Sequence, residues 1–335
     1  MAQIVFTGIE GWEEPYLQEK LPGHQLTFIR RPLQQQDWPG LARTEILSPF
    51  IYTAVNAEVL DKLPNLKFIA TRSTGFDHID VEVCHERKIK VANVPYYGEN
   101  TVAEHTWALI LALSRKIFQS YERTERGDFS NDGLRGFDLK GKILGVIGCG
   151  HIGQSVIKVA EAFGMKVVVV DVNKDSTLAR ELNFEYVTLD ALLKESDVIT
   201  LHAPYNKKTH HLLNADNLKL IKHGAILVNT ARGGLIDTVA LVDALEKGML
   251  SGAGLDVLEE ECYIKEETEL LSEEFKKKCD LRTLLADHML IQRRDVIITP
   301  HNAFNSQEAI MRILDTTVEN IKGYLEGKVT NEVSK

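Results

Sequence analysis

Short runs of apolar residues alternate with longer amphipathic segments along almost the whole chain. In the first third, the apolar runs predict strands at residues 3–8, 25–30, 46–52, 66–71 and 90–94. Segments between them, such as 56–63 and 80–87, have the spacing of polar and apolar residues that is typical of helices. This alternation predicts a small parallel α/β unit.

A second series of the same kind begins at Lys142. Its apolar runs are rich in β-branched residues and are continuous rather than alternating, as expected for strands buried on both faces. They predict strands at residues 142–147, 166–171, 197–202, 225–230, 252–257 and 296–299. The sequence therefore predicts an α/β protein that contains a second, larger parallel sheet.

Three further segments stand apart from the two series. Residues 101–126 predict one long, buried helix, with Thr101 as its N-cap and Glu104 at the spacing of a capping box. Residues 307–327 predict an amphipathic helix at the end of the chain. The highly charged segment 260–284 predicts an exposed, helical insertion.

Composition and charge narrow the classes of partner. The chain has 335 residues and a formal net charge of -9, which disfavours nucleic acid and anionic membranes as partners. Its 4 cysteines are scattered without a CxxC pair, so we expect neither a disulfide framework nor a zinc site. No basic leader and no apolar run of membrane-spanning length is present, and we expect a cytoplasmic protein.

A glycine-rich motif follows the first strand of the second series. Gly148, Gly150 and Gly153 fit the pattern GxGxxG between a predicted strand and a predicted helix. The first glycine permits a tight turn, the second lets a pyrophosphate approach the backbone, and the third lets the helix pack on the strand. A purely structural turn would not need all three glycines between a buried strand and a helix, so the motif predicts a dinucleotide site.

The next strand of this series ends at Asp171. An acid at this position binds the hydroxyl groups of the adenosine ribose and repels the 2′-phosphate of NADP. The two residues that follow include no arginine to receive such a phosphate. NAD is therefore the predicted cofactor, although an aspartate here is also able to cap a helix.

Three polar residues follow other predicted strands. Arg232, Glu261 and His301 come after the strands at 225–230, 252–257 and 296–299, and ligands of a parallel sheet bind at this edge. An arginine holds a carboxylate with a two-pronged hydrogen bond, and a histidine moves a proton. A nearby glutamate favours the charged imidazole. Taken singly, they also fit a surface arginine, an ordinary acidic run and a loop histidine.

Taken together, the motifs resemble those of one family. GCGHIG, VVVVD, LHAP, NTARGGLID, GAGLDVLEEE and TPHNAF occur in that order, and TRSTGFDHID and VPYYGENTVAEHT precede them. The sequence resembles the D-isomer-specific 2-hydroxyacid dehydrogenase family over nearly its whole length, and it is most similar to the D-lactate dehydrogenase branch.

The resemblance implies a domain arrangement. Residues 1–100 and 301–335 would form a discontinuous, flavodoxin-like substrate-binding domain, and residues 101–300 a Rossmann NAD-binding domain, both doubly wound parallel sheets with the active-site cleft between them. It also implies a homodimer, formed through the region from Thr101 to Arg126.

The resemblance further implies the roles of individual residues. Arg232 binds the substrate carboxylate and carbonyl, and His301 donates the proton. Glu261 pairs with His301, and the neighbouring Glu259 and Glu260 are the alternative candidates for that role. The implied substrate contacts are Thr74, Gly75, Tyr97 and Phe304. The implied cofactor contacts are Gly148, Gly150, His151, Ile152, Gly153, Asp171, His202, Ala203, Pro204, Thr209, Thr230, Ala231, Arg232 and Asp256.

The predicted reaction is the reversible, NAD-dependent reduction of a 2-oxo acid to a D-2-hydroxy acid, with pyruvate and D-lactate as the first pair. Gly98, Glu99, Thr74 and Asn305 depart from the lactate pattern and would admit a more polar substrate. One alternative is a relative acting on glycerate, phosphite or a phosphorylated hydroxy acid, with Arg72 as an extra cation or else as a structural salt-bridge partner. Another is an NADH-sensing protein like the family's transcriptional corepressors.

Overall fold

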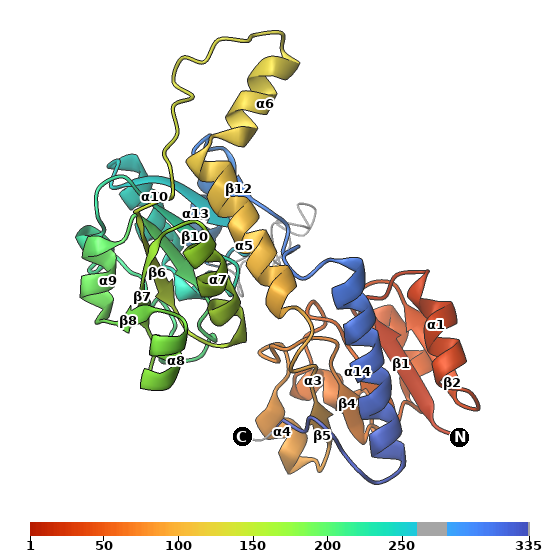
Figure 1. Ribbon diagram of the computed structural model, residues 1–335. Helices are drawn as coiled ribbons and strands as arrows, with labels where there is room; N and C mark the ends of the chain where they lie inside the picture. The colour runs from red at the N-terminus through yellow and green to blue at the C-terminus, as the bar shows by residue number, and fades with distance from the viewer. Residues whose placement is uncertain (260–279, 334–335) are drawn as a thin grey trace. The chain divides into compact units, whose positions relative to one another are not determined.

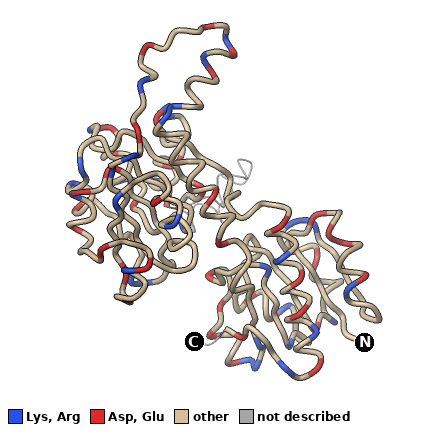
Figure 2. The backbone as a smooth tube through the Cα atoms, viewed as in Figure 1, with Lys and Arg blue, Asp and Glu red and all other residues tan. Residues whose placement is uncertain are grey.

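The computed structural model describes residues 1–259 and 280–333, which form two compact units (Figure 1). The first unit comprises Met1–Tyr97 together with Asn305–Lys335, and the second comprises Gly98–Phe304. The second unit is thus inserted into the chain of the first. Acidic and basic residues are interspersed along both units (Figure 2).

The first unit is built on a parallel sheet of 5 strands in the order β2-β1-β3-β4-β5, which is the flavodoxin-like order. Its strands are β1 (Gln3–Thr7), β2 (Gln25–Ile29), β3 (Ile46–Ser48), β4 (Phe68–Ala70) and β5 (Lys90–Ala92). One face packs against α1 (Glu13–Lys20) and α14 (Gln307–Leu325). The other packs against α2 (Trp38–Leu41), α3 (Ala57–Asp61) and α4 (Val81–Glu86).

The second unit is built on a parallel sheet of 7 strands in the order β12-β11-β10-β9-β6-β7-β8. Its strands are β6 (Ile143–Ile147), β7 (Lys166–Val170), β8 (Phe184–Tyr186), β9 (Val198–Leu201), β10 (Ala225–Asn229), β11 (Leu250–Leu255) and β12 (Val296–Ile298). This is the Rossmann order with one strand added at an edge, and the strand order reverses between β6 and β9. Two doubly wound parallel sheets confirm the predicted fold class.

Helices cover both faces of the larger sheet. One face packs against α5 (Glu99–Ser114), α7 (His151–Ala162) and α8 (Ser176–Glu181). The other packs against α9 (Leu189–Glu195), α10 (Thr238–Glu246) and α13 (Leu281–Ile291). Buried aliphatic side chains fill both layers, so the strands are apolar on both faces as their composition predicts.

Side-chain caps fix where many of these helices begin. In each case a short polar side chain accepts a backbone N–H from the first turn and so satisfies a group that has no partner within the helix. The capping residues are Asn56, Asp80, Asp175, Thr188, Asp237, Asp280 and Ser306.

The helix predicted over residues 101–126 is wrong in two respects. It begins earlier, with Gly98 as the N-cap, and it is broken into α5 and α6 (Ile117–Glu125) at Lys116, which has a left-handed φ of 51°. The break has a tertiary cause, because the backbone N–H of Phe137 donates to the carbonyl of Ser114 at 2.9 Å. In Figure 1, α6 stands out from the body of the second unit.

Other differences are small. The sequence pattern missed β8, a short strand with Glu185 in its middle, whereas the helix predicted at 307–327 is confirmed as α14. Of the predicted insertion 260–284, residues 260–279 lie outside the described residues, and α13 begins at Leu281. Among the described residues, no helix is both long and apolar enough to span a membrane.

Candidate active site

Those predicted cofactor and catalytic residues of the second unit that the structure describes lie in the segments that follow its parallel strands. Strands β12, β11, β10, β9 and β6 are consecutive in the sheet, so the segments that follow them share one edge. Open α/β sheets bind their ligands at this edge, at the point where the strand order reverses.

The glycine motif has the geometry that a dinucleotide pyrophosphate requires. Gly148 has a φ of +96°, and a Cβ there would lie 2.7 Å from the backbone of His202 and Ala203. A Cβ on Gly153 would lie 2.2 Å from the carbonyl oxygen of Gly148. A Cβ on Gly150 would meet nothing within 4 Å, so this position is open to a ligand. Helix α7 begins here, and its first N–H groups favour an anion.

Asp171 connects the glycine loop to the end of β7. One carboxylate oxygen accepts the backbone N–H of Cys149 at 2.7 Å, and the other accepts that of Asn173 at 2.8 Å. Each oxygen keeps further acceptor capacity, so Asp171 fits a partner for ribose hydroxyls. The same hydrogen bonds give it a structural role that the sequence pattern did not indicate.

The remaining predicted cofactor residues form the surrounding loops. His202, after β9, shares a hydrogen bond with Thr200 at 2.9 Å, and desolvation lowers the pKa of its imidazole to about 3, so it is neutral. Thr209 closes the turn after Pro204 by donating to its carbonyl at 2.7 Å. Thr230 is buried against α5, where its hydroxyl meets that of Thr106 at 2.9 Å. His151 and Ile152 lie in the first turn of α7, and Ala231 follows Thr230.

Arg232 lies in a tightly fixed turn after β10. The side chain of Asn229 accepts the N–H of Ala231 at 3.0 Å and donates to the carbonyl of Arg232 at 2.9 Å. A Cβ on Gly233 would lie 2.1 Å from the carbonyl group of Leu258, and one on Gly234 would lie 2.7 Å from the ring of Tyr205. The two glycines thus let other segments pack closely on the turn that carries the arginine.

His301 lies in a loop that Asp256 holds in place. Asp256 is 1% exposed, and its carboxylate accepts the hydroxyl of Thr299 and the backbone N–H groups of Asn302 and Ala303, at 2.7 and 2.9 Å. His105 of α5 adds a contact, 3.4 Å from its Nε2 to the carboxylate. His301 itself has a left-handed φ of 52°. Sequence reasoning missed His105, although VAEHT was among the motifs.

The glutamate run after β11 is only partly described. Glu259 is bound within the second unit, with His211 Nε2 at 2.5 Å from one oxygen and the Thr238 hydroxyl at 3.0 Å from the other. Glu260 and Glu261 lie outside the described residues. The structure therefore gives Glu259 other partners and leaves the assignment of Glu261 as a prediction.

The predicted substrate residues divide between the units. Thr74 and Gly75 follow β4 in the first unit, where the Thr74 hydroxyl donates to the carbonyl of Val94 at 2.7 Å. Tyr97 belongs to the same unit, and its carbonyl accepts from the side chain of Arg312 at 2.6 Å. Phe304 belongs to the second unit, with its ring 6.5 Å from that of His301.

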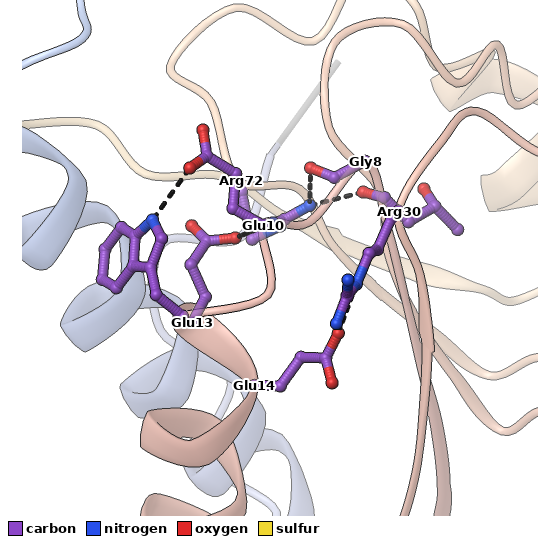
Figure 3. Close-up of polar contacts among 8 residues, drawn as sticks. Gly8, Glu10, Glu13, Glu14, Arg30 and Arg72 are labelled. Atoms are coloured by element: carbon purple, nitrogen blue, oxygen red, sulfur yellow. Dashed lines mark hydrogen bonds and ion pairs between the residues drawn. The ribbon is translucent and has the colours of Figure 1, made fainter.

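Arg72 is a structural residue rather than an extra substrate cation. It is 2% exposed, donates to the carbonyls of Thr7 and Gly8, and pairs with the buried Glu13 at 3.4 Å (Figure 3). Burial raises the pKa of the Glu13 carboxyl, and the charge of Arg72 opposes that rise. Because Arg72 lies two residues before Thr74 in the loop after β4, these contacts anchor that loop to the end of β1.

Comparisons with known proteins identify the family. Residues 107–303 match the family described as D-isomer specific 2-hydroxyacid dehydrogenase, NAD binding domain. A D-lactate dehydrogenase of Escherichia coli is 35% identical over 95% of each chain, and a glyoxylate reductase of Thermococcus litoralis is 34% identical over 85% of this chain and 82% of its own.

A solved structure is similar over nearly the whole chain. The D-lactate dehydrogenase of Aquifex aeolicus, complexed with NAD and lactic acid, is 38% identical, with a TM-score of 0.87 over 97% of this chain and 96% of that one. The order of the strands, the open glycine loop and these matches agree. The chain therefore belongs to the D-isomer-specific 2-hydroxyacid dehydrogenase family and is an NAD-dependent oxidoreductase.

Proposed function

We propose that this chain reversibly reduces a 2-oxo acid to a D-2-hydroxy acid, with pyruvate and D-lactate as its natural pair. The observation that carries the proposal is the placement of Arg232 and His301 after β10 and β12, on either side of β11 at the cofactor-binding edge of one sheet. The two relatives named D-lactate dehydrogenase, which match nearly end to end, support this choice of substrate.

His301 is the proposed acid and base. Bound nicotinamide cofactor supplies or accepts the hydride at C2 of the substrate. In reduction, protonated His301 donates its proton to the carbonyl oxygen, and in oxidation neutral His301 accepts the hydroxyl proton. The hydrogen bonds of Asp256 support this role, because they fix the loop that carries the imidazole.

Arg232 is the proposed partner of the substrate carboxylate. Its planar guanidinium offers two parallel donors, which suit a carboxylate better than a single ammonium does. The backbone N–H groups of Thr74 and Gly75 are proposed as further donors to the carboxylate, and Tyr97 and Phe304 as walls of the pocket. The Arg72 contacts that anchor the loop after β4 support a fixed position for these donors.

Glu261 is the proposed partner of His301. A carboxylate beside an imidazole stabilises its protonated form and orients the ring. The contacts of Glu259 with His211 and Thr238 support this choice over Glu259, because they engage both of its carboxylate oxygens.

NAD fits the residues of the glycine loop. The open space at Gly150 and the start of α7 would receive the pyrophosphate, and Asp171 would bind the ribose hydroxyls. The loops with His202, Ala203, Pro204, Thr209, Thr230 and Ala231 would line the remainder of the site.

A homodimer in the cytoplasm is proposed as the working form. Apolar side chains are exposed on and beside α6, with Ile117 53%, Phe118 49%, Tyr121 63% and Phe129 84% exposed. Exposed apolar side chains gathered on one helix and the loop after it favour an interface, and in this family a second copy of the chain is the expected partner.

Three alternatives are distinct from this proposal. The similarity to a glyoxylate reductase favours glyoxylate as a second substrate. A substrate carrying a phosphate is disfavoured, because the nearest extra cation, Arg72, is buried and bound to Glu13 and two carbonyls. An NADH sensor would bind the cofactor without turnover.

A panel of 2-oxo acids tests the proposal. The purified chain is mixed with NADH and pyruvate, glyoxylate, hydroxypyruvate or a phosphorylated 2-oxo acid, and loss of NADH absorbance is followed. We expect the highest kcat/KM with pyruvate and formation of the D isomer of lactate. Binding of NADH without turnover of any of these acids would instead favour the sensor.

A further inference from the structure

A group of metal-ligating side chains lies beside the turn that carries Arg232 and has no part in the proposed reaction. One ring nitrogen of His210, one of His211 and one carboxylate oxygen of Glu259 all lie within 4.8 Å of one another. They come from two segments, the loop after β9 and the segment after β11. Tertiary structure therefore brings them together across 48 residues of sequence.

The backbone at His211 is arranged so that two consecutive histidines meet. His211 has a left-handed φ of 49°, which is uncommon for a residue with a side chain. Its N–H donates to the carbonyl of Gly234 at 2.9 Å, and its own carbonyl accepts from the side chain of Asn214 at 3.0 Å. These bonds hold the turn, and the rings of His210 and His211 stack with their centroids 3.8 Å apart.

Each of the three side chains has a second hydrogen-bond partner or backbone anchor behind it. The hydroxyl of Tyr205 lies 3.1 Å from Nδ1 of His210, and the hydroxyl of Thr238 donates to Oε2 of Glu259 at 3.0 Å. The other carboxylate oxygen of Glu259, Oε1, lies 2.5 Å from Nε2 of His211. Partners of this kind orient the ligands in protein metal sites.

We propose that His210, His211 and Glu259 bind a divalent transition-metal ion of the zinc type, with water completing the coordination. Two imidazoles and one carboxylate form a ligand set that zinc takes in proteins. His210 is exposed, whereas His211 and Glu259 are partly buried, so an ion reaches the group from solvent. The site is independent of the scattered cysteines, on which the expectation of no zinc site rested.

Binding requires two small movements. The ring planes of His210 and His211 stack at an angle of 25°, so His210 must rotate about its side-chain bonds for both rings to direct a nitrogen at one ion. His211 and Glu259 must also separate slightly, because the ion replaces their direct hydrogen bond. The exposure of His210 permits the first movement.

The bound ion would connect two segments that flank the turn of Arg232. Glu259 directly follows Leu258, whose carbonyl packs on Gly233, and Tyr205 packs on Gly234. An ion on Glu259 and His210 would therefore hold both segments against this turn. Since an ion that binds only the folded chain stabilises it by mass action, zinc should raise the melting temperature.

Zinc titration of the purified full chain tests the site. The chain is first freed of metal with a chelator and then titrated with ZnCl2 in competition with a chromophoric chelator, without substrate. We expect His210→Gln to weaken the tightest site by about tenfold or more, because even the loss of a partner behind a ligand costs about tenfold to a hundredfold in metal affinity. His223→Gln, at another exposed histidine of the second unit, is the matched control and should titrate like the unchanged chain.

The rise in melting temperature with zinc should follow the same pattern, present in the unchanged chain and in His223→Gln but lost in His210→Gln. Glu259→Gln should also weaken the site. The proposal is overturned if the unchanged chain takes up no zinc in this competition, or if His210→Gln binds it as tightly as the unchanged chain. Because no substrate is present, neither result bears on the proposed dehydrogenase activity.

Discussion

The backbone N–H of His301 donates to the carbonyl of Asp256 at 2.8 Å, and the carboxylate of Asp256 binds the two residues that follow His301. Through these bonds, a buried acid at the end of β11 sets the conformation of the loop that carries the proposed catalytic imidazole. His301 takes a left-handed φ within this loop. Its position thus depends on a side chain 45 residues earlier in the sequence, and this dependence can be tested.

Asp256→Asn should lower kcat. It should also make the loss of stability in acid less steep than it is in the unchanged chain. Burial alone would raise the pKa of the Asp256 carboxyl, but hydrogen bonds from His105, Thr299 and the loop backbone lower it overall. A carboxyl with a lowered pKa adds stability above its unfolded pKa of about 3.9, and this is lost as the pH falls through the folded value.

The measurement is the melting temperature from neutral pH down to about pH 2, a range that includes the unfolded pKa of about 3.9 and extends below it, where the folded carboxyl titrates. Asp256→Asn should be less stable at neutral pH and should show a shallower fall in acid. We expect kcat to drop by about tenfold to a hundredfold, since small displacements of a catalytic group have effects of this size. An acid fall as steep as that of the unchanged chain would contradict the role given to this carboxylate.

Much of the fold was predictable because the strands are continuous apolar runs, as in β6 and β7. The three-residue strand β8 was missed because Glu185 interrupts its apolar pattern. The break at Lys116 was missed because its cause, the bond from Phe137 to Ser114, joins residues far apart in sequence. Local patterns contain no information about such contacts.

The candidate active site was predictable from the sequence to a similar extent. The glycines at 148, 150 and 153 were found because their spacing follows directly from the turn that they make. The pairing of Glu259 with His211 and that of Arg72 with Glu13 could not be predicted, because each requires the folded arrangement of distant segments. Nothing in the neighbouring sequence of Glu259 or Arg72 indicates which distant residue each of them contacts.

Asp171→Ala should narrow the preference for NADH over NADPH. In the unchanged chain we expect that preference to be at least about tenfold in kcat/KM, or about 1.4 kcal/mol, because the carboxylate repels a 2′-phosphate. Since Asp171 also binds the N–H of Cys149, the variant should lose some affinity for both cofactors. Equal use of both cofactors by the unchanged chain would contradict the assignment of Asp171 as the residue that selects NAD over NADP.

Arg232→Lys retains the positive charge but loses the planar pair of donors. We expect the KM for the 2-oxo acid to rise by about tenfold or more and kcat to fall, since a bidentate contact to the carboxylate is lost. The Kd for NADH, measured by fluorescence titration, should change little. Unchanged steady-state kinetics would exclude Arg232 from substrate binding.

Phe118→Glu should dissociate the proposed homodimer. The ring is 49% exposed on α6, a helix without a buried residue, so a charge there costs the isolated chain little. In an apolar interface the same charge would be left without water or a partner. Light scattering after gel filtration should give the dimer mass for the unchanged chain and the monomer mass for the variant. A variant that keeps the dimer mass would place the interface elsewhere.

Glu261→Gln should move the pH dependence of the reaction, whereas Glu259→Gln should not. A carboxylate beside His301 stabilises its protonated form, which reduction requires, so losing that charge should shift the alkaline fall in reductive kcat/KM to lower pH. For oxidation, which requires neutral imidazole, the rising limb should shift the same way. His301→Ala should lower the rate by about 10² to 10⁴. Glu259 serves as the matched control, because its carboxylate is bound by His211 and Thr238. If Glu259→Gln moves the profile and Glu261→Gln leaves it fixed, then the partner of the catalytic histidine is two residues earlier than proposed.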